Sequence, residues 1–211
     1  MRTPRRTPAP RLALLALAAA ALTACGSASG SPQLLGAQLP EPYTKPAVTL
    51  TDTTGRPYDV PARTAGAATL VYFGYTHCPD VCPTAMADTA AALRALPQSV
   101  RDKTRVLFVS SDPARDTPAV LADWLGAFDF GRGTTVTGLT GPYDVITRFA
   151  TALNVPLEKP VVTAGNYEVG HGARLTGFTL GGKGTVAWLP GEGQQLEKQL
   201  RHDLPLLVAA T

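Results

Sequence analysis

Hydrophobic residues form two kinds of pattern along this chain. The runs Ala68–Gly74 and Thr104–Ser110 are dominated by apolar, β-branched and aromatic residues, which is typical of strands buried on both faces of a sheet. Apolar positions at helical spacing predict a helix over Thr84–Leu96. The same spacing predicts two helices with proline in the first turn, at Pro118–Phe128 and Pro142–Leu153. Strands and helices therefore alternate through the middle of the chain.

Turn residues mark two hairpins. An Asp-Thr-Thr-Gly turn separates strands predicted at Val48–Thr51 and Tyr58–Val60, and a Gly-Gly-Lys-Gly turn follows a strand predicted at Arg174–Leu180. The remaining predicted elements are strands at Thr134–Leu139 and Thr185–Leu189 and a C-terminal helix at Gln194–Ala209, interrupted or kinked at Pro205. This order predicts an α/β fold, in which helices flank both faces of a mixed central β-sheet with an N-terminal β-hairpin.

The N-terminal segment has the pattern of an export signal. Met1–Arg11 is rich in arginine, and Leu12–Ala24 is an apolar run of thirteen residues. Such a run is shorter than the roughly 20 residues that a membrane-spanning helix needs, and it fits the apolar part of a signal peptide. Leu22-Thr23-Ala24-Cys25 ends the run and looks like a bacterial lipobox, in which the cysteine is lipidated. An ordinary signal peptide with an incidental cysteine is the alternative, and Arg5-Arg6 leaves both Sec and Tat export open.

These features divide the chain into three parts. We predict a signal peptide over residues 1–24, a lipidated Cys25 with a flexible Gly/Ser/Pro-rich tether over residues 25–46, and a folded domain over residues 47–211. Several acyl chains on Cys25 would anchor the protein stably to a membrane, where a single chain would be marginal. The expected location is the extracytoplasmic face of a bacterial cell membrane.

The charge of the chain excludes one class of partner. The formal net charge is +3, from 19 basic and 16 acidic residues, but four of the arginines lie within the first eleven residues. The remainder therefore has 15 basic against 16 acidic residues, a net charge of about −1. We expect no nucleic-acid partner, because no basic face stands out.

The candidate chemistry lies in Phe73–Pro83, whose sequence is FGYTHCPDVCP. Cys78 and Cys82 stand between a buried strand and a helix, which is the thioredoxin-like arrangement. With Pro83 at the first helical position, Cys82 lies near the helix N-terminus, where the dipole and free amides are expected to lower its thiol pKa. Two such thiols can form a disulfide or jointly hold a soft metal, and the three-residue spacer leaves more room between the sulfurs than Cys-x-x-Cys does.

A metal site of this kind needs one or two more ligands, which points to the histidines. His171 lies in a glycine-flanked loop just before the Arg174–Leu180 strand, and in the thioredoxin architecture that loop packs against the cysteine loop. We therefore predict that His171 is the third ligand. His77 is interpreted as a surface residue that tunes the loop, because strand-exit geometry points neighbouring side chains apart. His202 and Met86 are interpreted as non-ligands, the latter as a core residue.

Three sequence blocks, in order, resemble the Sco/SenC family: FGYTHCPDVCP, then Ser111–Pro118 (SDPARDTP), then a late Tyr-x-Val-x-His ending at His171. Members of that family are membrane-anchored, thioredoxin-fold copper proteins involved in assembling the CuA centre of cytochrome c oxidase. The resemblance implies copper binding by Cys78, Cys82 and His171. It also implies partners: the CuA-bearing oxidase subunit and another copper chaperone.

The chain departs from the family pattern before His171, where Gly170 replaces the usual aspartate. This removes a carboxylate that could orient the imidazole, but it removes no ligand. The Ser111–Pro118 loop is interpreted as structural: Asp112 and Asp116 can cap a helix, Arg115 can form an ion pair, and Pro118 starts a helix.

The same residues leave two functions open. The first is a monomeric, lipid-anchored copper chaperone that holds Cu(I) or Cu(II) on Cys78, Cys82 and His171. The second is a thiol:disulfide reductase, in which Cys78 and Cys82 cycle through a disulfide to keep the cysteines of a copper protein reduced. A peroxiredoxin-like peroxidase is a weaker third, since Thr76-His77-Cys78 lacks the Thr-x-x-Cys spacing.

Overall fold

The two strands with the most continuous hydrophobic sequence form the centre of the sheet. In the computed structural model β4 (Ala68–Gly74) pairs in parallel with β5 (Thr104–Ser110), and both predictions of their bounds are confirmed. The structure describes residues 33–159, 161–163, 166–168, 172–191 and 195–211. Residues 34–211 form one compact unit. Among the described residues, no helix is long and apolar enough to cross a membrane.

The sheet is mixed, as predicted. Its order is β1 (Ala37–Thr44), β10 (Lys183–Trp188), β9 (Leu175–Phe178), β4, β5, β6 (Thr135–Thr140), β2 (Thr49–Asp52) and β3 (Pro57–Asp59). The β4, β5 and β6 strands run parallel, and the other pairings are antiparallel. The carboxyl ends of the three parallel strands therefore meet at one edge, where the loops after β4 and β5 lie side by side. Both predicted hairpins, β2–β3 and β9–β10, are confirmed.

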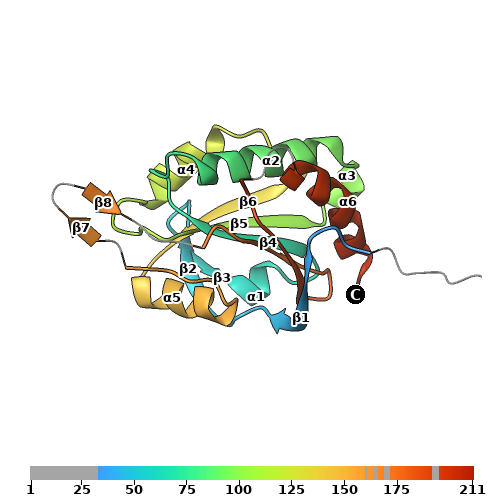
Figure 1. The fold of residues 1–211 in the computed structure, drawn as a ribbon, viewed down its shortest axis with the longest axis horizontal. Coiled ribbons are helices and arrows are strands. Elements are labelled where there is room, and N and C mark those ends of the chain that lie inside the picture. The colour runs from blue at the N-terminus through green and yellow to red at the C-terminus, as the bar shows by residue number, and fades with distance from the viewer. Residues whose placement is uncertain (1–32, 160, 164–165, 169–171, 192–194) are drawn as a thin grey trace, which may run out of the picture. The chain divides into compact units, whose positions relative to one another are not determined.

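Helices cover both faces of this sheet (Figure 1). One face carries α2 (Val81–Ala95), α3 (Gln98–Arg101), α4 (Pro118–Gly126) and α6 (Gln195–Ala209), and the other carries α1 (Val60–Arg63) and α5 (Tyr143–Ala152). A small separate hairpin consists of β7 (Val161–Thr163) and β8 (Asn166–Glu168). The thioredoxin-like fold predicted from the alternating elements is thus confirmed.

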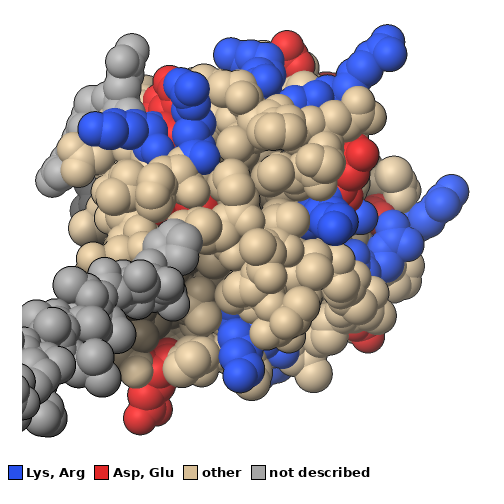
Figure 2. Space-filling view, turned by 90° about the vertical axis from the view of Figure 1, so that its right-hand side faces the viewer, with Lys and Arg blue, Asp and Glu red and all other residues tan. Residues whose placement is uncertain are grey.

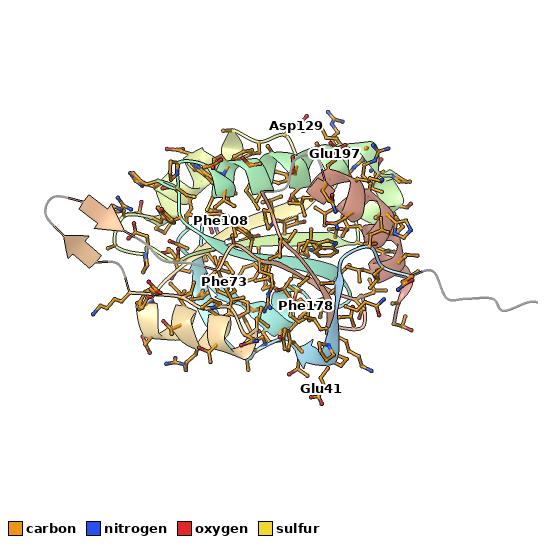
Figure 3. The ribbon with its side chains drawn as sticks, viewed as in Figure 1. Glu41, Phe73, Phe108, Asp129, Phe178 and Glu197 are labelled. Carbon is orange, nitrogen blue, oxygen red and sulfur yellow. The ribbon has the colours of Figure 1, made fainter. Side chains whose placement is uncertain are left out.

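Strand alternation divides the core into two clusters. Leu70 and Tyr72 of β4 pack in the cluster with α2, α4 and α6, whereas Val71 and Phe73 pack in the cluster with α5. Figure 3 shows the same division, with Phe108 on the side of α2 and Phe73 on the side of α5. A fully buried strand with both faces covered explains why its sequence is continuously hydrophobic. On the face shown in Figure 2, the Lys and Arg side chains of the described residues are interspersed with Asp and Glu.

The tether predicted over residues 25–46 is wrong in its last part, because Ala37–Thr44 forms β1 at the edge of the sheet. Most β1 residues are exposed, so the strand carries no hydrophobic alternation that sequence could reveal. It is held through its backbone, and its start is fixed by Asp203 of α6, which accepts hydrogen bonds from the Leu35 and Gly36 amides at 2.8 and 2.9 Å.

Three helices also differ from the predictions. The helix predicted to begin at Thr84 begins at Val81, because the first four amides of a helix need no partner and Pro83 is tolerated there. The helix predicted to end at Phe128 ends at Gly126. The C-terminal helix continues through Pro205, so no interruption occurs at that residue.

Candidate metal centre

The cysteine loop lies at the edge where the parallel strands end. It leaves β4 at Gly74, turns at a hydrogen bond from the Cys78 amide to the Tyr75 carbonyl (3.2 Å), and enters α2 at Val81. Cys82 is therefore the second residue of α2, which confirms its expected place at a helix N-terminus. Neither Cys78 nor Cys82 is in a disulfide.

The two thiols are in contact but differ in depth. The Cys82 amide donates a hydrogen bond to Cys78 Sγ at 3.4 Å, and the two thiols also hydrogen-bond to each other. The Cys78 sulfur thus accepts from one of the amides that the first turn of a helix leaves free. Cys78 is 8% exposed and Cys82 is 0% exposed. The pair places two soft donors side by side, of which Cys78 lies closer to the solvent and Cys82 is fully buried.

The Cys82 sulfur occupies a tight pocket below the loop. The Tyr72 hydroxyl donates to it at 3.8 Å, and Tyr72 is itself fully buried. A Cβ atom at Gly74 would lie 2.8 Å from Cys82 Sγ and 2.9 Å from the Tyr72 ring. Glycine is needed at this position because any side chain would displace the sulfur or the ring.

Burial raises the pKa of the Cys82 thiol far above its usual range, and the hydrogen bond that this thiol donates to Cys78 adds to this. A backbone hydrogen bond from Tyr75 acts in the opposite direction but is weaker. The expectation that the helix N-terminus would lower this pKa is therefore wrong for the free thiol, since desolvation outweighs the amides. A metal that takes this sulfur as a ligand must displace its proton, so binding would release protons.

The Ser111–Pro118 loop holds the cysteine loop through Asp116, which is fully buried. Its carboxylate accepts hydrogen bonds from the Thr76 hydroxyl at 2.6 Å, from the Thr76 amide at 3.2 Å and from the Ser110 hydroxyl at 2.7 Å. The Ser111 amide also donates to the Gly74 carbonyl at 2.7 Å. The loop thus has a structural role, as interpreted, and the part of the molecule that it supports is the candidate site.

The roles within this loop are only partly as expected. Arg115 pairs with the buried Asp112, and its guanidinium lies 6.0 Å from the ring centroid of Tyr75. Pro118 begins α4, but the residue that caps this helix is Thr117, whose hydroxyl accepts from the Val120 amide at 3.3 Å. The capping role expected of Asp116 is therefore wrong, because its carboxylate is directed to Thr76. Nothing local in the sequence could reveal a contact between residues 40 positions apart.

The remaining predicted residues separate into described and undescribed ones. Cys25, Gly170 and His171 lie outside the described residues, so the predictions for them stay predictions. Among the described residues, no group of three or more His, Cys, Asp or Glu side chains could hold a metal ion. Met86 is fully buried in the core, as interpreted. His202 lies in α6 with its Nδ1 2.8 Å from Asp203 Oδ1.

A thioredoxin-like domain with a dithiol where β4 meets α2 defines a class of thiol-bearing redox and metal-handling proteins. Comparison with known proteins narrows the class. The SCO1/SenC family model matches residues 37–199, most of the chain. The chain therefore belongs to the SCO1/SenC family.

Individual relatives agree with this. SenC of Rhodobacter capsulatus is 39% identical over 118 residues, which are 56% of this chain and 47% of SenC. Copper-bound ScoI of Bradyrhizobium japonicum is 31% identical, with a TM-score of 0.62 over 82% of this chain and 99% of that chain. The chain spans less than two thirds of the length of the curated relatives that it matches, such as SenC.

A third likeness is in fold alone. BsSco, a member of the Sco family of cytochrome c oxidase assembly proteins in which a disulfide switch was identified, is 18% identical. Its TM-score is 0.63 over 85% of this chain and 98% of that chain.

Proposed function

We propose that the chain is a copper chaperone that takes part in maturing the CuA centre of cytochrome c oxidase, with copper as its cargo. The observation that carries the proposal is the contact between the Cys78 and Cys82 thiols, where β4 meets α2. Membership in the SCO1/SenC family and the copper bound by the related ScoI support it.

The donor chemistry fits this cargo. Two thiolates are soft ligands that select Cu(I) among available metals, and an imidazole would favour Cu(II). We propose His171 as the third ligand, because its loop precedes β9, and β9 pairs directly with β4, the strand that leads into the cysteine loop. Gly172, next to this loop, is anchored by its amide to the Pro156 carbonyl at 2.8 Å.

The depth of the two sulfurs suits a carrier. A cargo ion must be held tightly enough to exclude competitors, yet it must leave by ligand exchange with a partner. Cys82 offers a sulfur fully shielded from solvent, and Cys78, which is 8% exposed, offers one that a partner's ligand could reach. We propose the CuA-bearing oxidase subunit as recipient, with a second copper chaperone as donor.

The test is a copper titration of the reduced full chain with Cu(I) and with Cu(II). We expect tight binding of one ion per chain, abolished in Cys78→Ser/Cys82→Ser and weakened by about 10- to 100-fold in His171→Ala. His202→Ala is the matched control and should bind like wild type. If the wild type binds neither ion tightly, the chaperone proposal fails; if His171→Ala equals wild type, the three-ligand site fails.

A thiol:disulfide reductase is the second candidate, favoured by the direct contact between the two thiols and by the disulfide switch identified in BsSco. In that reaction the Cys78 and Cys82 thiols would become a disulfide, and two electrons and two protons would pass to a partner disulfide. The measurement is the redox equilibrium of the pair against glutathione. A pair that glutathione readily reduces would act as an oxidant rather than a reductant, which would contradict this role.

We also propose that Cys25 carries the membrane anchor on the extracytoplasmic face of a bacterial cell. The test is incorporation of labelled fatty acid into wild type and Cys25→Ser expressed in a bacterium. Label in the wild type alone is expected, because Cys78 and Cys82 are buried in the domain. Equal label in the variant would contradict the assignment.

A further inference from the structure

A chain of hydrogen bonds runs from the core to the surface of the cysteine loop. It starts at the fully buried Asp116, passes through the Thr76 hydroxyl and ends at His77, the exposed neighbour of Cys78. The Thr76 hydroxyl oxygen lies 2.6 Å from Asp116 Oδ1 and 3.1 Å from His77 Nδ1.

The hydrogens in this chain can be assigned by counting donors. Ser110 Oγ accepts from the Asp112 amide at 3.0 Å, so its own hydrogen goes to Asp116 at 2.7 Å. The Asp116 carboxylate also accepts from the Thr76 amide and therefore acts throughout as an acceptor. The single hydroxyl hydrogen of Thr76 thus goes to Asp116, and Thr76 Oγ1 can only accept from His77.

This assignment fixes the tautomer of His77. Its Nδ1 must carry the hydrogen, which leaves a lone pair on Nε2. Histidines that ligate metals through one ring nitrogen commonly donate the other N–H to an oxygen that orients the ring. The structure gives His77 Nε2 no hydrogen-bond partner among the described residues, and the side chain is exposed.

The three candidate metal-donor side chains of the loop differ in how far they are buried. His77 is exposed, Cys78 is 8% exposed and Cys82 is 0% exposed. His77 forms no three-residue ligand group with the two thiols in the described part of the chain, so the geometry does not make it a resident ligand. Its place is outside the pair, as the most exposed of the three donors.

We propose that His77 Nε2 is the exchange ligand through which copper passes between a partner and Cys78. This rests on the proposed copper-chaperone function and revises the interpretation of His77 as a surface residue that only tunes the loop. On loading, the bond to Nε2 forms as a ligand of the donor leaves. The bond to Cys78 Sγ then replaces it as the thiol proton goes to solvent. No electron is transferred, and unloading reverses the order.

The first test reads the tautomer and needs no copper. The full chain labelled with ¹⁵N-histidine is studied by NMR at pH 8.5, and the His77 ring is assigned by its loss in His77→Gln. We expect hydrogen on Nδ1 in the wild type and in Thr76→Ser, which keeps the hydroxyl. Thr76→Val removes the acceptor, so the hydrogen of the His77 ring should no longer be held on Nδ1. Hydrogen on Nε2 in the wild type would overturn the assignment.

The second test separates exchange from affinity. Cu(I) release to a chelator is followed by stopped flow, and equilibrium affinity by competition. In His77→Gln the release rate should fall by on the order of tenfold, the lower end of what residues around a metal contribute, while affinity stays within about twofold. Thr76→Val should show a smaller loss of rate, and Thr76→Ser and His202→Gln none.

The outcomes distinguish this inference from the function on which it rests. If the wild type binds no copper, the chaperone proposal fails, whatever the tautomer. If it binds copper and His77→Gln releases it at the wild-type rate, only the exchange role fails. If His77→Gln lowers the equilibrium affinity by tenfold or more, His77 is a resident ligand, which also overturns the exchange role.

Discussion

Two fully buried aspartates hold two different regions of the molecule by the same chemistry. Asp116 accepts hydrogen bonds from Thr76 and Ser110 and so fixes the cysteine loop. Asp203 accepts from the Leu35 and Gly36 amides and from Trp188 Nε1 at 3.0 Å, and so fixes the start of the edge strand β1. One carboxylate supports the candidate site and the other supports the architecture. Their loss should therefore have separable consequences.

The largest loss of stability is expected for Asp203→Ala. Three buried or partly buried donors lose their acceptor, and each unsatisfied donor costs about 1–3 kcal/mol, so a loss of at least about 3 kcal/mol in the free energy of unfolding is expected. Denaturant unfolding measures it. The exposed Asp123→Ala is the control and should unfold like wild type. The reactivity of the dithiol should not change, and a change would contradict the separation of the two regions.

Gly74→Ala tests the packing below the cysteine loop. The new methyl would lie 2.8 Å from Cys82 Sγ, so a loss of about 1–3 kcal/mol is expected from overpacking. Unlike Asp203→Ala, this variant should also alter the rate at which Cys82 reacts with a thiol reagent. Gly126→Ala, where a Cβ meets nothing within 4 Å, is the matched control. Equal stability of the two variants would show that the sulfur is not confined.

Asp116→Asn and Asp203→Asn form an isosteric pair that tests the comparison directly. In each variant the new side-chain amide nitrogen faces a hydrogen-bond donor of the protein. We therefore expect a loss of about 1–2 kcal/mol in the free energy of unfolding for either variant. Only Asp116→Asn should loosen the cysteine loop. A looser loop lowers the effective concentration of one thiol at the other. The equilibrium constant for closing the Cys78–Cys82 disulfide should therefore fall by on the order of tenfold. Titration against glutathione measures this equilibrium constant. Equal constants in the two variants would contradict the assignment of the cysteine loop to Asp116 alone.

A pH dependence is expected at Lys45, which directly follows β1. Its ammonium donates to the Thr64 and Ala67 carbonyls and to Thr69, and burial lowers its pKa from 10.5 to about 8. Because the unfolded chain then binds more protons between pH 8 and 10.5, this group makes stability rise with pH across that window. The difference in unfolding free energy between wild type and Lys45→Met should follow this slope. Both proteins contain the same buried tyrosines, so the contribution of these tyrosines cancels in the difference. On its own that contribution has the opposite sign, because burial raises the tyrosine pKa values. A difference that does not vary with pH would contradict the assignment.

Much of the fold was predictable because its signals are local. The bounds of β4 and β5 follow from continuous hydrophobic runs, and the β2–β3 hairpin follows from its turn. The edge strand β1 could not be predicted, since an exposed strand is held by backbone pairing that leaves little mark on side-chain pattern. The helices α2, α4, α5 and α6 were predicted to within a few residues, with the largest error at α2, where cysteine and proline occupy the first turn. The short helices α1 and α3 were not predicted.

For the site, the sequence by itself determined that two cysteines stand between a buried strand and a helix, and that a second motif follows β5. Only the tertiary structure decided that Asp116 reaches Thr76 across 40 residues and that Asp203 reaches Leu35 across 168. It also decided that burial outweighs the helix N-terminus at Cys82. Patterns along a chain record which face of an element is buried. They do not record which buried polar groups meet, because such contacts depend on how whole elements pack together.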